Sequence, residues 1–460
     1  MLGRVPRIMI RHHHSRSPAA PRAGERGTVL LAALCFATVL TLAVGSYLTL
    51  CYRSLQMSSR NMNSEHSVEL AETGMEEALW ALNANHSTGD WTGWTISGTT
   101  ATKTLSGFTY DNGVSGAVSL KVTNYTGASG TRTVTVTGTT TLADGTTTSR
   151  TLTSTSAQAP LFVNAVAATG STLSFSNGGT ADSYDSSINV DPNTGQTPGY
   201  AAVLASAAPA TSSPTVTLTN AQVKGYVASL YSGAPGYSGS GQLTGPTTPA
   251  GTKIDLNRVS TSPYQPSFDI KTPTGAGTTL SNPATNSTTT LGVATDTSPR
   301  LYYCSGLDLT GTTRIIVDGP VQLVMTGGGA FYLGLHGGTP SIQVTTNGSL
   351  EVFTTGDIAL YGGGIVNATK LPKNVAIYGT NALTVPDMNT TTPFYGVLYT
   401  PNGNFTVAAN ATIYGALVAK KVSFTGAAPA LHYDLNLRQT VFAGLDTPFA
   451  VSNWNESSSP

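Results

Sequence analysis

The chain opens with a polar, arginine-rich segment and then turns apolar. From Thr28 to Tyr52 no residue carries a charge. About 20 apolar residues suffice to cross a bilayer core as a helix, and this run is longer than the core of a cleaved secretory signal. The pattern therefore predicts a transmembrane helix. The helical pattern continues to about Asn83, because apolar residues recur on one face and glutamates keep to the other.

Polar and β-branched residues alternate between about residues 95 and 156. The alternation is clearest at residues 118–122, 132–137 and 149–153, and glycine-containing turns separate these segments. A period of two with β-branched residues is typical of half-buried strands. We expect a small antiparallel sheet here that covers the exposed face of the helix.

The strongest internal repeat lies in residues 358–418. Tyr-Gly occurs there four times, 17, 17 and 19 residues apart, at Tyr361, Tyr378, Tyr395 and Tyr414. A period below about 20 is too short for a helix pair or a propeller blade. It favours a parallel β-solenoid, in which each coil stacks on the previous one, and the four tyrosines should then form one row. An antiparallel β-sandwich is the alternative.

Together these patterns predict a mainly β chain with one long N-terminal α-helix, a small antiparallel sheet next to the helix and a C-terminal parallel β-solenoid (β-helix). The expected segments are a basic cytoplasmic leader at 1–27, a transmembrane and amphipathic helix at 28–83, a small antiparallel β domain at 84–158, a solenoid domain at 159–440 and a tail at 441–460. Residues 195–300 are rich in Pro, Gly, Ser and Thr and predict an insertion of long surface loops.

The charged residues are unevenly distributed along the chain, and their distribution predicts the topology. The chain has 23 basic and 23 acidic residues, but residues 1–27 hold six arginines and one acid, Glu25. The positive-inside rule keeps that end in the cytoplasm. A single-pass topology follows, with the bulk of the chain in the periplasm or at the cell surface. Balanced charge excludes a globally basic nucleic-acid binder, and three cysteines exclude a disulfide scaffold.

A basic leader that ends in Gly27, an uncharged helix that starts at Thr28 and the sequence AETGMEEAL at residues 71–79 resemble type IV pilin-like proteins, especially PilX-type minor pilins. The resemblance implies that a leader peptidase cuts between Gly27 and Thr28 and that the helix is stored in the membrane before assembly. Ala32 stands where major pilins carry a glutamate, which favours the PilX-type branch. An uncleaved signal anchor is the simplest alternative.

A second resemblance involves residues 161–188, with NGG at 177–179, and the sequences FYGVLYTPN at 394–402 and IYGALV at 413–418. They are similar to an exported solenoid-like domain of unknown function that often follows PilX-type N-termini. The resemblance covers about residues 161–437. It implies one discontinuous domain whose 160s–190s pack as the first coil beneath the later ones. That family has no assigned catalytic residues, so none is transferred.

Candidate catalytic and metal-binding groups are sparse. Enzymes that cut acidic polysaccharides need clustered carboxylates, but the acidic residues of the expected solenoid do not recur at the coil spacing. They are Asp308, Asp318, Glu351, Asp357 and Asp387. We expect Asp182 and Asp185 to hold a turn rather than calcium. The run His432-Tyr433-Asp434 is expected to cap or pack, since no serine or cysteine nucleophile can be placed beside it.

We therefore expect a non-enzymatic envelope protein without metal or cofactor. The favoured function is a pilin-like minor component of a type IV pilus, or of a related secretion or adhesion machinery, that presents the solenoid. Membrane lipid, other pilin-like subunits and a leader peptidase are the expected partners, and nucleic acid is not. The alternatives are a membrane-anchored surface protein outside any filament and, more distantly, a polysaccharide-active β-helix enzyme.

Overall fold

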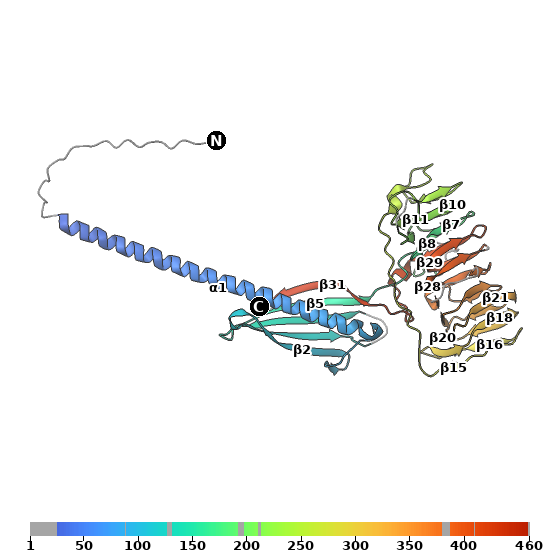
Figure 1. The fold of residues 1–460 in the computed structure, drawn as a ribbon, viewed down its shortest axis with the longest axis horizontal. Helices are drawn as coiled ribbons and strands as arrows, with labels where there is room; N and C mark the ends of the chain where they lie inside the picture. Colours follow the sequence, from blue (N-terminus) through green and yellow to red (C-terminus); the bar gives the residue numbers. More distant parts are fainter. Residues whose placement is uncertain are drawn as a thin grey trace.

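The fold is mainly β with one long N-terminal helix (Figure 1). The computed structural model describes residues 25–87, 89–126, 131–191, 197–209, 213–379, 387–408 and 410–458. Helix α1 (Glu25–Ser87) has 63 residues, and strands, loops and short 3-10 helices make up the rest. The short helices are η1 (Asp111–Gly113), η2 (Leu256–Arg258), η3 (Pro372–Asn374) and η4 (Leu435–Gln439). The predicted fold class is confirmed at this level, while the leader at 1–24 lies outside the described residues.

A six-stranded antiparallel sheet lies along the C-terminal half of α1 (Figure 1). In spatial order its strands are β1 (Thr95–Ser97), β2 (Thr100–Thr109), β3 (Ser115–Thr123), β4 (Arg132–Thr141), β5 (Thr147–Gln158) and β31 (Phe449–Ser458). In β4 every second residue is buried, so Val134 and Val136 face the core while Thr135 between them faces outward. The predicted period of two thus produces the sheet that was expected beside the helix.

Helix and sheet approach closely because glycine stands on both sides of the contact. A Cβ atom on Gly74 of α1 would lie 2.5 Å from Cγ1 of Val118 and of Val136. A Cβ on Gly138 of β4 would lie 2.7 Å from the backbone nitrogen of Ala71. Neither distance leaves room for a methyl group, so these glycines set the spacing between α1 and the sheet.

Strand β31 corrects the predicted tail at 441–460. The strand pairs antiparallel with β5 and completes the sheet, with Phe449 opposite Gln158. Phe449 is buried, and its backbone exchanges hydrogen bonds of 2.6 and 3.1 Å with the side chain of Asn83 at the end of α1. Every strand from β6 to β30 lies between β5 and β31 in the sequence, so no local pattern indicates their pairing.

The second part of the molecule is a stack of parallel strands, β6 to β30, which we call the parallel stack (Figure 1). Its strands form three rows. The longest row runs, from one end to the other, through β15 (Thr278–Thr279), β17 (Arg300–Cys304), β20 (Pro320–Met325), β23 (Ser349–Thr354), β26 (Val375–Gly379), β28 (Phe394–Val407), β29 (Thr412–Phe424), β6 (Val166–Ala168), β9 (Ala202–Ser206), β11 (Gln222–Ser229) and β14 (Val259–Ser260).

The other two rows lie beside it, and the long strands β11, β28 and β29 bend so that they contribute to more than one row. One row comprises β18 (Leu307–Gly311), β21 (Phe331–Gly338), β24 (Ile358–Tyr361), β27 (Met388–Asn389), β28, β29, β7 (Leu173–Phe175), β10 (Val216–Thr219) and β12 (Gly236–Ser238). The other comprises the run β16 (Thr288–Leu291), β19 (Arg314–Val317), β22 (Ser341–Val344) and β25 (Ile365–Asn367), and the run β28, β29, β30 (Ala430–Asp434), β8 (Thr180–Tyr184), β11 and β13 (Gln242–Thr244).

Aliphatic side chains stacked in register form the core of the parallel stack. Along the longest row, equivalent positions in successive strands are all buried: Leu323, Val352, Ile377, Leu398, Leu417, Val166, Leu204 and Val227. One turn of chain cannot bury its own apolar face, so each turn is stabilised by the turns on either side of it.

The chain enters the parallel stack in its middle, not at an end. Residues 166–184 pair with β29 and β30 on one side and with β9, β10 and β11 on the other. The expectation that the 160s–190s form the first coil beneath the later ones is therefore wrong. From β14 the chain passes to the opposite end, begins again at β15 and returns turn by turn (Figure 1).

The predicted insertion of surface loops at 195–300 is also wrong in part. Strands β9 to β16 lie in this segment and extend the parallel stack at both ends. Many of their core positions are small or β-branched, such as Ala205, Val216 and Val223, and leucines such as Leu204 and Leu218 fill others. A narrow stack fills its core with such residues, so a low content of large side chains does not exclude strands here.

The four Tyr-Gly tyrosines do not form one row. Tyr395 and Tyr414 are in register, with ring centroids 4.3 Å apart and planes 8° from parallel. Tyr378 lies in register with Tyr399, and Tyr361 lies in register with Asn389. The single row predicted from the repeat is therefore wrong for Tyr361 and Tyr378.

The tyrosines do not form one row because the number of residues in one turn of the parallel stack varies. Val321 pairs with Leu350, whereas Val397 pairs with Ala416 after a much shorter stretch of chain. The pairs β23–β26 and β26–β28, which lie between these two, have intermediate separations in the sequence. Of these four pairs, only β28–β29 has a separation that equals a spacing of the Tyr-Gly repeat.

Candidate functional site

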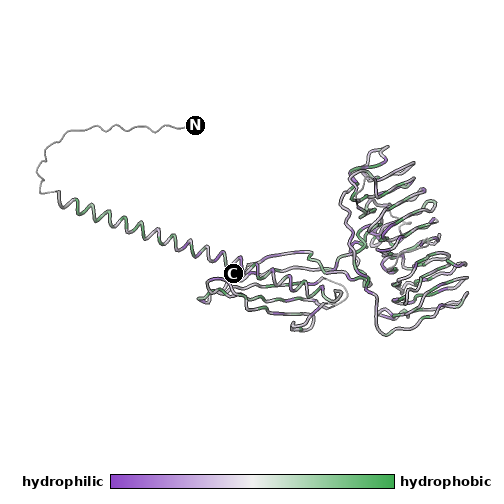
Figure 2. Tube along the Cα trace, in the orientation of Figure 1, coloured by the Kyte–Doolittle hydropathy of each residue, from purple (hydrophilic) through white to green (hydrophobic). Residues whose placement is uncertain are grey.

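The N-terminal half of α1 is a rod of exposed apolar side chains. Leu30 is 75 % exposed and Phe36 is 78 % exposed. Figure 2 shows this half of the helix as predominantly hydrophobic. By length and composition α1 is able to cross a membrane, and it is the one helix in the described ranges that passes this test. It fits a single-pass membrane anchor, and a signal sequence near an N-terminus fits the same description.

The polar side chains of this apolar segment satisfy themselves within the helix. The hydroxyls of Thr38, Thr41, Ser46 and Thr49 donate hydrogen bonds of 2.6–2.9 Å to backbone carbonyls three or four residues earlier. Hydrocarbon offers no hydrogen-bond partners, so a segment inside a bilayer must pair its polar groups internally. The arrangement meets that requirement.

The predicted leader-peptidase site lies at the start of α1. Gly27 and Thr28 follow directly on the first residues of the helix, Glu25 and Arg26. Cleavage between them stays a prediction.

The glutamates expected to form a solvated face of α1 lie largely at the surface. Glu69, Glu72 and Glu76 are exposed. Glu77 is half-buried and accepts a 2.6 Å hydrogen bond from the ammonium group of Lys103 on β2. That ion pair links the helix to the sheet.

The acidic residues of the parallel stack have structural partners. Asp318 accepts a hydrogen bond from Thr345, and Asp308 lies 2.8 Å from Nδ1 of His336. Glu351 accepts hydrogen bonds from the Gln322 amide at 2.8 Å and from the Tyr378 hydroxyl at 3.2 Å. Burial, together with the charge of Glu351, raises the pKa of Tyr378 well above its usual range.

Asp387 is the most perturbed carboxyl group of the parallel stack. It is 1 % exposed, and its Oδ2 accepts a 2.6 Å hydrogen bond from the backbone N–H of Thr406. Burial raises the pKa of Asp387 to about 8, and the negative charge of Asp357 adds to the shift. Carboxylates do not recur from one strand to the next, because Tyr332 and Ala359 stand between Asp308 and Asp387, which share a row three strands apart. At about 4.8 Å per strand they are roughly 14 Å apart, farther than a glycosidase pair.

The segments around Asp182 and His432 meet across the middle of the parallel stack. Asp182 lies 2.6 Å from Nδ1 of His432, and the His432 ring stacks on Tyr414 with centroids 4.7 Å apart. The Tyr433 hydroxyl donates to the Phe162 carbonyl at 2.7 Å, and Asp434 accepts from Ser186 at 2.7 Å. The three side chains of the His-Tyr-Asp run thus have separate partners, consistent with packing and capping.

The neighbouring Asp185 forms an Asx turn. Its Oδ1 accepts hydrogen bonds from the backbone N–H and the hydroxyl of Ser187 and from the Asn436 amide. These hydrogen bonds lower the pKa of Asp185. Within the described ranges, no group of three or more His, Cys, Asp or Glu residues is placed to hold a metal ion.

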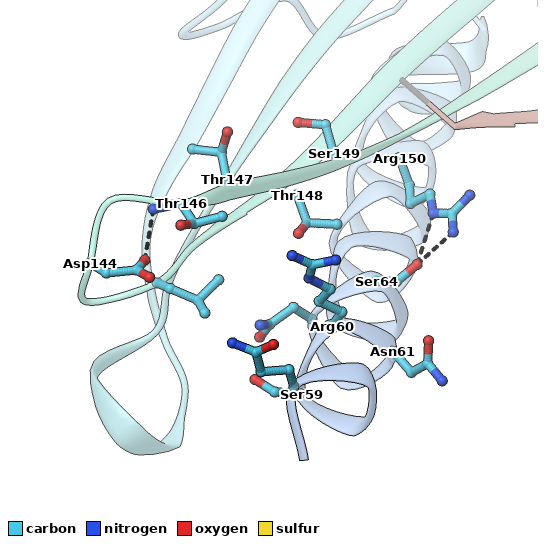
Figure 3. A pocket seen from close by; sticks show the side chains of 13 residues that line it. Ser59, Arg60, Asn61, Ser64, Asp144, Thr146, Thr147, Thr148, Ser149 and Arg150 are labelled. Carbon is cyan, nitrogen blue, oxygen red and sulfur yellow. Dashed lines mark hydrogen bonds between the residues drawn. The ribbon is translucent and has the colours of Figure 1, made fainter. Parts of the chain in front are cut away.

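A cavity of about 570 Å³ lies where α1 meets the β4–β5 hairpin (Figure 3). Six residues of α1 between Gln56 and Ser64 line it, with seven residues of the hairpin between Leu142 and Arg150. We call it the junction cavity. Arg150 donates to the Ser64 hydroxyl through Nε at 2.9 Å and Nη2 at 2.7 Å. Figure 3 shows Arg60 reaching from α1 toward Thr148.

Buried polar groups lie between Asn63, which lines the junction cavity, and the core. Ser67 donates to the carbonyl of Asn63 at 2.8 Å, and its hydroxyl lies 3.0 Å from that of Thr140. No local pattern predicts this cavity, because Arg60 and Arg150 lie far apart in the sequence and belong to no motif. Only the packing of α1 on the hairpin brings them together.

Residues 274–440, less than half of the chain, match a family described as a domain of unknown function (DUF7305). These residues hold β15 to β30, and the description assigns no activity from which a residue role could be transferred. No curated protein matches the chain.

Among solved structures, the chain is similar to the competence-associated pilin ComZ from Thermus thermophilus, at 13 % sequence identity. The alignment covers 86 % of this chain and 98 % of that chain, with a TM-score of 0.26. Such a low score does not indicate a shared fold.

Proposed function

We propose that the chain is a pilin-like minor component of a type IV pilus, or of a related secretion or adhesion machinery, with a PilX-type N-terminus. In this proposal the parallel stack is a β-solenoid that α1 presents outside the cytoplasmic membrane. The role is non-enzymatic. The partners are membrane lipid, a leader peptidase and other pilin-like subunits.

The observation that carries the proposal is the division of α1 into two halves. Residues from Thr28 to Met62 are almost all exposed although many are apolar, whereas the later positions from Asn63 to Leu82 bury one face against the antiparallel sheet. A continuous helix thus joins a segment suited to lipid to a folded head. The resemblance of residues 24–83 to PilX-type N-termini supports the same interpretation.

The solenoid assignment is supported by the three rows of parallel pairs and by the aliphatic residues in register along the longest row. The non-enzymatic role is supported by the acidic residues. Asp318 and Glu351 are hydrogen-bonded within the parallel stack, and Asp387 is buried, so the pair Asp357 and Asp387 does not present two carboxylates to a groove.

N-terminal sequencing of the chain, isolated from its native membrane, tests the proposal. A first residue at Thr28 supports a processed pilin-like subunit, whereas an intact start near Met1 refutes processing and favours the uncleaved anchor. A Gly27→Leu variant is the matched control, since a bulky side chain should block a peptidase that the resemblance ties to glycine. Shearing the cells adds a second readout, because a filament component is released with other pilin-like subunits and an uncleaved anchor stays in the membrane fraction.

A further inference from the structure

We propose that the junction cavity binds the phosphate-bearing headgroup of an anionic membrane lipid. The inference rests on the proposed membrane anchoring of α1 and goes beyond it, because it assigns a ligand class to a particular site. Its volume of about 570 Å³ lies within the range of roughly 300–1,000 Å³ that is usual for small-molecule sites.

The membrane-side end of the cavity, at Gln56, lies at the level of the headgroups. Gln56, the first residue that lines it, comes four residues after Tyr52, the end of the uncharged segment. At 1.5 Å per residue of helix this is a rise of about 6 Å. The headgroup layer adds about 5–7 Å to each side of the hydrocarbon core. A lipid beside α1 can therefore place its phosphate at the mouth of the cavity while its acyl chains stay in the bilayer.

The cavity also holds guanidinium groups that suit a phosphate. Among the described residues Arg60 has no hydrogen-bond or ion-pair partner, although it is directed toward Thr148 (Figure 3). Arg150 keeps a bond to Ser64 and lies 3.8 Å from Glu456. A guanidinium group binds phosphate oxygens through two parallel N–H donors, which gives such sites both affinity and direction.

One acidic residue, Asp144, lines the cavity as well. Its carboxylate accepts a 2.9 Å hydrogen bond from the backbone N–H of Thr146, which holds the β4–β5 turn and lowers the pKa of Asp144. Figure 3 shows it on the turn, on the side away from Ser64. The lining therefore has two positive charges and one negative charge, and the negatively charged carboxylate of Asp144 already accepts a hydrogen bond within its own turn.

A second, independent observation points to a ligand. Asn63 lines the cavity and is 1 % exposed, but its Oδ1 has no hydrogen-bond partner within the described parts of the chain. A buried acceptor without a donor is unfavourable. The hydroxyls of a glycerol headgroup, as in phosphatidylglycerol, supply that donor next to the phosphate. A phosphatidylcholine headgroup has no such donor and no net charge.

The test uses the full chain, reconstituted into vesicles of mixed phosphatidylglycerol and phosphatidylcholine. After gentle solubilisation, native mass spectrometry counts the lipids that remain bound. We expect one phosphatidylglycerol on the unchanged chain. In Arg60→Gln its occupancy should fall about tenfold or more, the loss usual for a charge-assisted hydrogen bond. Arg53→Gln is the matched control, because it removes the same charge from the same helix but lies outside the cavity; its occupancy should stay within about twofold.

Three results would overturn the headgroup site. They are equal retention of phosphatidylcholine, unchanged retention in Arg60→Gln, and displacement of the lipid by inorganic phosphate at an equal concentration, which would mark a site for a free anion. Alkaline extraction of the same vesicles separates the two proposals. A chain that is washed off refutes the membrane anchor together with the site, whereas an anchored chain without bound phosphatidylglycerol refutes the site alone.

Discussion

Replacing Gly138 by alanine tests whether the antiparallel sheet holds α1 through close backbone contact. The added Cβ would come closest to the backbone carbonyl oxygen of Ser67 and would also lie 2.7 Å from the backbone nitrogen of Ala71 and 2.9 Å from Cβ of Leu70. Ordinary van der Waals contact begins at 3.4 Å, so the contact with Ala71 alone requires the helix to move away from the sheet by about 0.7 Å, and the contact with Ser67 requires more. The clash involves the backbone of α1, which no side-chain rotation relieves.

The size of the effect follows from two opposing terms. Overpacking of a core contact costs about 1–3 kcal/mol, and a clash with backbone belongs in the upper half of that range. Alanine reduces the entropy of the unfolded chain relative to glycine, which offsets about 0.4–1 kcal/mol. The net loss should be about 1–2 kcal/mol. At about 1.4 kcal/mol per factor of ten, the opening equilibrium of the helix–sheet contact rises about 5- to 30-fold.

Hydrogen–deuterium exchange of the full chain in detergent measures this opening. Amides of residues 63–84 in Gly138→Ala should exchange about 5- to 30-fold faster, while amides of the parallel stack stay unchanged. Ser119→Ala is the control, because Ser119 is an exposed position of β3 in the same sheet. Exchange in Gly138→Ala within about twofold of the unchanged chain would refute the reasoning that close contact fixes α1 to the sheet.

Three further predictions concern the parallel stack and strand β31. The pKa of Asp387 is about 8 in the folded chain, against 3.8 for an ordinary aspartate as in the unfolded chain, so the folded chain binds more protons between these values and stability falls as the pH rises toward about 8. Asp387→Asn should abolish this decrease, and a wild-type melting temperature that is flat between about pH 6 and 9 would contradict it. Tyr414 stacks on both Tyr395 and His432, so Tyr414→Leu should lower the free energy of unfolding by about 1–3 kcal/mol in urea titrations; a loss below about 0.5 kcal/mol would mean that the stacking contributes little. Deleting residues 449–460 removes the buried Phe449, which alone contributes about 1.5–3 kcal/mol, so limited proteolysis should cut the antiparallel sheet faster; an unchanged cleavage pattern would show that β31 is dispensable.

Local sequence patterns predicted the helix and the strands whose formation depends on residues close together in the sequence. The uncharged segment from Thr28 to Tyr52 and the recurrence of apolar residues up to Leu82 predicted α1, because a helix forms through contacts three and four residues apart. The alternation in residues 132–137 and 149–153 predicted β4 and β5 for the corresponding reason, since side chains of a strand alternate between its faces. Neither prediction required knowledge of distant segments.

The Tyr-Gly repeat predicted the structure less completely. It marked a region of stacked parallel strands, but the turns of the chain there differ in length, from the long turn that separates β20 from β23 to the short one that separates β28 from β29. Loops of variable length connect the strands, so a constant spacing in the sequence does not correspond to a constant position in the stack. Tyr395 and Tyr414 are paired, whereas Tyr361 and Tyr378 occupy other positions.

Hydrophobic periodicity is a local property, so the order of residues was enough to predict that a long helix with an apolar first half precedes a β-rich chain. Tertiary structure alone decided where the chain enters the parallel stack, how β31 closes the antiparallel sheet, and how Arg60 comes to face the β4–β5 hairpin. Each of these depends on pairing or packing between segments far apart in the chain. Such contacts are selected by the complementarity of whole surfaces, which no short stretch of residues contains.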